Sequence, residues 1–140
     1  MRLELSSLNK AVFSLERSVK VAEAKLSQEI QVCDEIETIK AGVIQNFEFT
    51  YELCWKFMKR WIEENVSRGI VDGVTRRELF RVGAENRLIN DVDEWMEYHY
   101  ARNLTSHIYD QDVAEQVYKT AVSFFPASKE FLERLKMRND

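Results

Sequence analysis

Hydrophobic residues near the amino end recur at alternating steps of four and three positions, which is the spacing of one face of an α-helix. The series comprises Leu8, Val12, Leu15, Val19, Ala22 and Leu26. Ser6 or Ser7 precedes the series, and serine is a favoured residue at a helix N-cap. We therefore predict a helix with a narrow apolar seam, opened by one of these serines.

A second helical pattern is the longest in the chain and runs from about Asp34 to Asn65. One stripe of this helix carries Ile36, Val43, Phe47, Tyr51, Cys54, Met58 and Trp61. Five further apolar residues widen that stripe, namely Phe49, Leu53, Trp55, Phe57 and Ile62. A helix that is apolar on more than one face is central to a bundle or shared with a partner chain.

A third and a fourth helix follow a glycine-containing break. Thr75 and Glu78 have the spacing of a capping box, in which each side chain binds a backbone N–H of the other residue. This predicts a short helix that ends at about Leu88. Asn90 or Asp91 then caps a fourth helix, which carries several aromatic residues.

The fifth helix is predicted to begin at a second capping box formed by Asp112 and Glu115. Pro126 lies inside its apolar pattern, and proline lacks the N–H that a helix interior requires. We therefore expect the helix to kink or restart at Pro126.

These elements predict an all-α fold, an antiparallel up-and-down helical bundle of four long helices plus one short one. The chain has 140 residues, which suits a single domain spanning residues 1–140. The second helix carries more aromatic surface than the other helices of one chain can cover, so we expect a homodimer.

Composition narrows the function classes. The net charge of −4 argues against broad, non-specific nucleic-acid binding, although a local basic patch remains possible. Several arginines gather in one stretch, and for any single one we prefer the interpretation of a solvated helix face; they are Arg60, Arg68, Arg76, Arg77, Arg81 and Arg87. No apolar run spans a bilayer and no signal peptide is evident, so we expect a cytoplasmic protein without membrane contact.

The segment 97–110, EYHYARNLTSHIYD, holds the candidate chemistry. Arg102 offers a planar charged fork that matches a phosphate, and His107 can move a proton near neutral pH. The phenol of Tyr109 can hydrogen-bond or accept a transferred group. Together these three side chains would suit cleavage of a phosphodiester without a metal.

The spacing of these residues leaves two interpretations open. Arg102 and His107 lie about 140° apart around a regular helix, so they converge only if the helix ends between them. Thr105 and Ser106 favour such an end. In the alternative, Asn103, Thr105 and Ser106 form only a capping turn, and spacing alone favours this second interpretation.

Other kinds of site find no support in the sequence. The two histidines have no evident third metal ligand, and Cys33 and Cys54 lack metal-ligand spacing, so we expect no metal and no cofactor. Glu48 and Glu52 are four positions apart on the second helix, a common spacing for surface carboxylates. There is no glycine-rich phosphate loop.

Two blocks of the chain resemble the HEPN superfamily, in the branch of nucleotidyltransferase substrate-binding proteins that is similar to HepT toxins. RNLTSHIY has the form Arg-x4-His-x-Tyr of that branch. Residues 46–64 resemble its long second helix, and residues 75–118 resemble its second half almost without gaps. The likeness covers about two-thirds of the chain.

This resemblance implies a helical bundle that dimerises and brings two copies of the motif together across a cleft. It also implies a small nucleotidyltransferase, encoded nearby, as partner. One role implied is a metal-independent endoribonuclease toxin that acts on RNA through Arg102 and His107. The partner then neutralises this toxin by adding nucleotides to Tyr109.

The resemblance equally implies an alternative, a non-catalytic subunit that presents a substrate to the transferase. Whether the chain is an enzyme therefore stays open at this stage. Asn103 matches the polar position that commonly follows the motif arginine, and Thr105 and Ser106 would support the turn. Ala101 departs from the branch, because an acid often directly precedes the arginine there.

Overall fold

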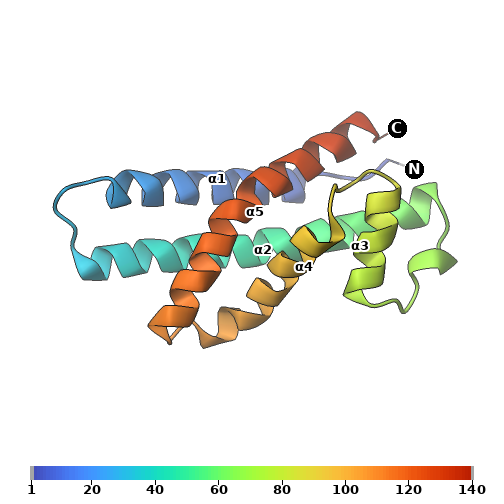
Figure 1. Ribbon diagram of the computed structural model, residues 1–140. Coiled ribbons are helices and arrows are strands. Elements are labelled where there is room, and N and C mark those ends of the chain that lie inside the picture. The colour runs from blue at the N-terminus through green and yellow to red at the C-terminus, as the bar shows by residue number, and fades with distance from the viewer. Residues whose placement is uncertain (1, 140) are drawn as a thin grey trace.

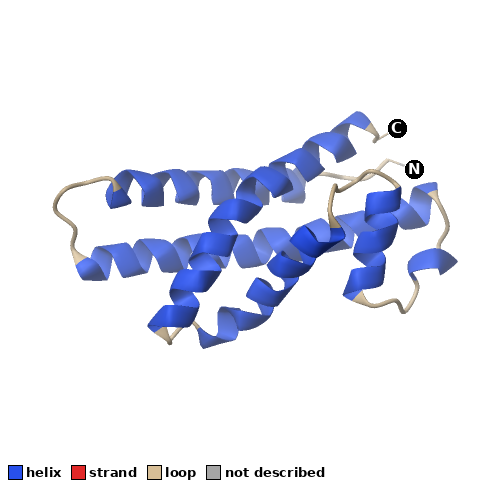
Figure 2. Ribbon diagram, in the orientation of Figure 1, coloured by secondary structure: helices blue, strands red, loops and turns tan. Residues whose placement is uncertain are grey.

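The computed structural model describes residues 2–139, which form helices and connecting loops with no strand in that range (Figure 2). The all-α prediction is confirmed. The helices are α1 (Ser6–Leu26), α2 (Cys33–Asn65), α3 (Arg76–Glu85), α4 (Val92–Asn103) and α5 (Gln111–Met137). Two short 3₁₀ helices connect them, η1 (Gly69–Val71) and η2 (Leu104–His107).

α1 and α2 run antiparallel along most of their length, and α5 crosses over both of them (Figure 1). α4 packs against α5 and α3, and α3 lies beside the carboxyl-terminal part of α2. The two ends of the chain meet, because Leu3 and Asn139 exchange two hydrogen bonds, of 2.7 and 2.9 Å. Each end of the chain is thereby anchored to the other.

α2 is the central helix, as its broad apolar surface predicts. The buried residues of its main stripe include Val43, Phe47, Tyr51, Cys54, Met58 and Trp61. Aromatic rings from α4 and α5 meet this stripe: the Phe124 ring lies 5.2 Å from that of Phe47 and 4.9 Å from that of Tyr98, both edge-on. Edge-on contact is a favourable geometry for aromatic pairs.

One expected member of the wider stripe on α2 does not pack inward. Phe49 is 54% exposed, whereas Phe57 and Ile62 are buried. Position 49 faces away from α1 and α5 because it lies two residues from the buried Phe47 and Tyr51, roughly 200° around the helix from each.

The start of α1 differs from the prediction that Ser6 or Ser7 caps it. Leu5 occupies the N-cap position and makes no side-chain capping bond. The carboxylate of Glu4 instead accepts the backbone N–H of Ser6 at 3.1 Å. An acidic residue just before the helix thus satisfies one free backbone donor, which the serines were expected to do.

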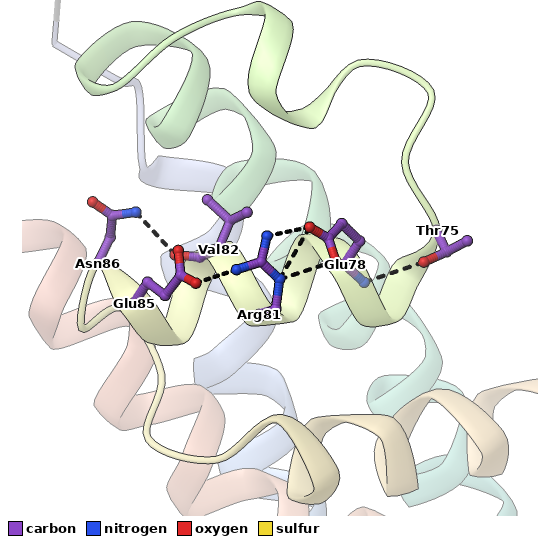
Figure 3. Close-up of polar contacts among 6 residues, drawn as sticks. All are labelled: Thr75, Glu78, Arg81, Val82, Glu85 and Asn86. Atoms are coloured by element: carbon purple, nitrogen blue, oxygen red, sulfur yellow. Dashed lines mark hydrogen bonds and ion pairs between the residues drawn. The ribbon is translucent and has the colours of Figure 1, made fainter.

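α3 is capped by Thr75, whose hydroxyl accepts the backbone N–H of Glu78 at 3.2 Å (Figure 3). The second half of the predicted capping box is absent among the residues described, because the Glu78 carboxylate binds Arg81 on the next turn. The helix ends at Glu85, before the predicted Leu88, because Arg87 adopts a left-handed backbone with φ of 59°. The Leu88 N–H then returns to the Gly83 carbonyl at 2.9 Å, a common helix-ending turn.

Asp91 caps α4, as predicted, by accepting the Asp93 N–H at 2.9 Å. The predicted capping box at Asp112 is wrong. Asp110 caps α5 instead, with its carboxylate 2.9 Å from the N–H of Asp112 and 3.3 Å from that of Val113. Two aspartates lie two positions apart here, and the earlier one is favoured because η2 ends just before it.

α5 remains one helix through Pro126, so the predicted restart does not occur. The helix changes direction along its length (Figure 1), which agrees with the alternative that Pro126 bends it. The hydroxyl of the buried Ser128 donates to the carbonyl of Phe125 at 2.8 Å beside the proline.

Candidate functional site

The motif 102–109 lies where α4 ends and η2 begins. α4 stops at Asn103, and the chain continues as a 3₁₀ turn to His107. The prediction that the helix ends between Arg102 and His107 is therefore confirmed. This change of helix type turns His107 and Tyr109 away from the axis of α4 and toward the start of α5.

Arg102 points back from α4 onto α2. Its Nε donates to the Glu52 carboxylate at 3.0 Å, and its terminal nitrogen lies 3.8 Å from the Glu48 carboxylate. A third guanidinium nitrogen donates to the hydroxyl of Thr105 at 3.4 Å. The plane of the guanidinium is thus set by three side chains, which leaves it oriented rather than free to rotate.

Glu48 and Glu52 contact Arg102, which the sequence interpretation missed. Both are partly exposed, and their spacing of four places both on the α2 face that meets Arg102. Nothing local to either glutamate marks it, since 50 positions separate Glu52 from Arg102. Only the packing of α4 on α2 brings them together.

Glu52 also matters for Ala101, which stands where an acid was expected directly before Arg102. Ala101 is 5% exposed and packs into the core, so a carboxylate at this position would be buried. The carboxylate that reaches Arg102 comes from α2 instead. The orientation of the motif arginine therefore does not require an acid at position 101.

His107 and Tyr109 form the second part of the motif. The Tyr109 hydroxyl lies 3.4 Å from Nδ1 of His107, and the two rings meet edge-on. Both side chains are exposed, Tyr109 to 83%. Within residues 2–139 no hydrogen bond joins this pair to Arg102, so one chain holds the motif as two separate parts.

The supporting polar residues, Asn103, Thr105 and Ser106, also differ in the contacts they make. Thr105 is buried, and its hydroxyl donates to the Arg102 carbonyl at 2.8 Å, which closes the helix end. Asn103 places its amide 3.5 Å from Nε2 of His99. Ser106 is exposed, and its side chain makes no hydrogen bond within the described part of the chain. The capping role predicted for this segment is therefore carried by Thr105, and it coexists with the contacts of Arg102.

His99 is a further residue of this surface that the sequence interpretation left unassigned. Its Nδ1 lies 2.9 Å from the hydroxyl of Tyr51 on α2. Burial lowers the pKa of His99, the neighbouring Arg76 and Arg102 lower it further, and Glu52 opposes them. Burial also raises the pKa of Tyr51, so its phenol stays protonated at neutral pH.

Tyr109 stands at the rim of a groove of about 830 Å³ between the amino-terminal parts of α2 and α5. Ile36, Ile44 and Ile108 contribute apolar lining. Lys40 and Glu115 form an ion pair of 2.6 Å in the same groove. A group attached to the Tyr109 hydroxyl would have both open solvent and this groove available to it.

The described residues contain neither a cluster of metal-ligating side chains nor a helix that could span a membrane. No three of the histidine, cysteine, aspartate and glutamate side chains in residues 2–139 are grouped so that they could hold a metal ion. Among these residues no helix is long and apolar enough to cross a membrane.

The described chain is an all-α bundle in which an Arg-x4-His-x-Tyr segment covers the end of the fourth helix and the turn after it. Residues 3–137 match the family described as nucleotidyltransferase substrate binding protein like. The chain belongs to this family, which confirms the resemblance seen in the sequence.

Particular relatives agree with the family assignment. The chain is 34% identical over 139 residues to a probable ribonuclease HepT of Haemophilus influenzae, and the match covers 99% of this chain and 95% of the relative. A solved Haemophilus influenzae structure, described as a substrate binding domain of a nucleotidyltransferase, superposes with a TM-score of 0.88. Its sequence is 34% identical, and the match covers 95% of this chain and 99% of that one.

A more distant structure shows that the fold is shared beyond close sequence likeness. A protein from Thermus thermophilus superposes with a TM-score of 0.64 at 21% identity. The match covers 87% of this chain and 98% of that one.

Proposed function

We propose that the chain is the partner subunit of a small nucleotidyltransferase and acts as a HepT-like, metal-independent endoribonuclease toxin. Its partner neutralises it by nucleotidylating Tyr109. The observation that carries this proposal is the exposed Tyr109 hydroxyl at 3.4 Å from Nδ1 of His107, on the turn that follows Arg102. The motif of the family and the likeness to a probable ribonuclease HepT support it.

In RNA cleavage the ribose 2′-hydroxyl gives its proton to a base and attacks the adjacent phosphorus, the bond to the 5′-oxygen breaks, and that oxygen takes up a proton. His107 is suited to move this proton, because imidazole exchanges protons near neutral pH. Arg102 is suited to stabilise the extra negative charge on the phosphoryl oxygens. Glu52 holds the guanidinium in place for this role.

Neutralisation follows from the contact between His107 and Tyr109. The Tyr109 oxygen would attack the α-phosphorus of a nucleoside triphosphate, pyrophosphate would leave, and the phenol proton would pass to a base. The product places a bulky anion on the oxygen that now touches the imidazole. The attached nucleotide then blocks access to His107, and its negative phosphate pairs with the imidazole and repels the phosphates of RNA.

One chain holds Arg102 and His107 apart, and a homodimer would resolve this separation. In a dimer Arg102 of one copy could lie opposite His107 of the other across a shared cleft. The exposed Phe49 on α2 and Tyr100 on α4 offer apolar surface for such a pairing. A strictly monomeric protein that cleaves RNA would remove this part of the proposal.

Expression without the partner tests the toxin function. The wild-type chain should arrest growth and cleave RNA in a purified assay without added metal, and His107→Ala should do neither. Ser106→Ala is the matched control, since Ser106 is exposed on the same turn and makes no side-chain hydrogen bond there. Equal behaviour of the wild type and His107→Ala would reject the ribonuclease function.

A second function, a non-catalytic subunit that presents a substrate to the transferase, rests on a different observation. Arg102 is already paired with two carboxylates, and the net charge is −4, which weakens the attraction for RNA. This function predicts a stable complex with the transferase, no RNA cleavage by the isolated chain and no gain of mass on Tyr109.

A further inference from the structure

Arg76, the first residue of α3, is partly buried and has no counter-ion within residues 2–139. Its guanidinium carbon lies 3.5 Å from the centre of the Trp55 ring, so the two groups are in close contact. Its Nε is buried and has no hydrogen-bond partner within residues 2–139. Burial lowers the pKa of Arg76, which reports the cost of removing this charge from water.

The neighbouring arginines of α3 are different. Arg77 pairs with Asp93 at 3.1 Å, and Arg81 binds both Glu78 and Glu85 (Figure 3). Of the arginines in α3, Arg76 alone has no carboxylate within ion-pair distance in the described chain. The interpretation of a solvated helix face fits Arg77 and Arg81 but is wrong for Arg76.

Arg76 belongs to the same surface as the motif arginine. Glu52 links them, because one carboxylate oxygen accepts from the Trp55 indole N–H and the other from Nε of Arg102, each at 3.0 Å. The Trp55 ring that Arg76 covers is therefore one side chain away from Arg102.

His99 lies within the electrostatic reach of both guanidinium groups. Each of them lowers its pKa, so the imidazole stays neutral near neutral pH. Two contacts hold the ring, one of 2.9 Å between Nδ1 and the Tyr51 hydroxyl and one of 3.5 Å between Nε2 and the Asn103 amide.

We propose that Arg76, stacked on Trp55, binds a phosphate of a nucleotide ligand beside Arg102 and so forms a second anion subsite of the motif. An unpaired guanidinium carries five donors and a fixed fork that matches phosphate. The outer face of the guanidinium offers a plane on which a base can stack.

Two sources could supply this phosphate, an RNA strand or a free nucleoside triphosphate. The RNA source rests on the proposed ribonuclease function, whereas the subsite chemistry does not. Binding is therefore measured in His107→Ala protein, so that cleavage plays no part in the readout. A wild type that fails to cleave RNA would then reject the ribonuclease function and leave the subsite to be judged on its own measurement.

The test compares Arg76→Gln with Arg77→Gln, both made in the His107→Ala background. Fluorescence anisotropy measures the affinity for a short labelled oligoribonucleotide at several salt concentrations, and calorimetry measures the affinity for ATP. Arg76→Gln should weaken binding of one ligand by about tenfold or more, since a charge-assisted contact is lost. For RNA, Arg76→Gln should also lower the slope of log affinity against log salt concentration by about one, which corresponds to one counter-ion.

Arg77→Gln should change either affinity by less than about twofold, because Arg77 is paired at the surface. Arg76→Lys, which keeps the charge without the planar fork, serves as a second variant if Arg76→Gln unfolds, and it should bind more weakly than Arg76 itself. A loss confined to RNA identifies the strand as the source, and a loss for ATP identifies the free nucleotide. Unchanged affinities for both ligands, or equal losses in Arg76→Gln and Arg77→Gln, would overturn the proposal.

Discussion

The carboxylate of Glu52 accepts a hydrogen bond of 3.0 Å from Nε of Arg102 and joins α2 to α4 across 50 positions of sequence. The same carboxylate accepts the indole N–H of Trp55. Glu52 thereby fixes the motif arginine against the central helix. The orientation of Arg102 is set by tertiary packing and owes little to its neighbours in sequence.

This contact predicts a measurable coupling between Glu52 and Arg102. Glu52→Gln should lower the free energy of unfolding by about 1 kcal/mol, because the pair is only partly buried and a neutral hydrogen bond replaces a charged one. A double-mutant cycle with Arg102→Ala in urea should give a coupling of about 0.5–1 kcal/mol. Strictly additive effects would show that the pair contributes nothing. Glu16→Gln on α1, which removes other surface ion pairs, is the control.

Replacement of the buried Trp61 should lower the free energy of unfolding much more. Its side chain is 6% exposed, its indole N–H donates to the Arg138 carbonyl at 3.4 Å, and the Arg138 guanidinium lies 4.4 Å from its ring. Trp61→Ala should cost about 3–5 kcal/mol in chemical denaturation. Phe13→Ala on α1, where the side chain is 56% exposed, should stay within about 0.5 kcal/mol. A loss below 1 kcal/mol for Trp61→Ala would mean that this ring does not belong to the core.

Replacing each of two helical glycines by alanine should change the free energy of unfolding in opposite directions. A Cβ added at Gly83 would lie 2.6 Å from Sδ of the fully buried Met58, whereas one added at Gly42 would meet nothing within 4 Å. Gly83→Ala should therefore destabilise by about 1–3 kcal/mol through overpacking. Gly42→Ala should stabilise by about 0.5–1 kcal/mol through helix propensity. Thermal unfolding of both variants checks this, and a stabilised Gly83→Ala would contradict it.

His99 predicts a pH dependence of stability. Its pKa is lowered in the folded state, so the unfolded chain binds the proton more tightly. The contribution of neutral His99 is fully present above the unfolded pKa of about 6.5 and is lost as the pH falls from there through the folded pKa. The unfolding midpoint should fall more steeply between pH 7 and 5 for the wild type than for His99→Gln. Identical slopes in the wild type and His99→Gln would contradict the prediction.

The sequence was sufficient for the helices and for part of the site. Hydrophobic periodicity located all five helices, because each must bury one face. The family resemblance pointed to Arg102, His107 and Tyr109 as the candidate site, and Thr105 and Ser106 favoured the helix end that the structure places after Asn103. Local pattern could not identify Glu52 or Arg76 as close to Arg102, because their proximity depends on how α2, α3 and α4 pack. It also misassigned the cap of α5, where two aspartates in near succession compete for one role.

The central claim, that Tyr109 is the acceptor of a nucleotidyl group, is tested most directly by intact-mass measurement. The chain is incubated with the partner nucleotidyltransferase and ATP, alongside Tyr109→Phe and Tyr100→Phe. Tyr100 is the control because it is 54% exposed on the neighbouring helix α4. The wild type and Tyr100→Phe should each gain the mass of one or more nucleotidyl groups, and Tyr109→Phe should gain none. An unchanged wild-type mass, or an equal gain in Tyr109→Phe, would contradict the proposed function.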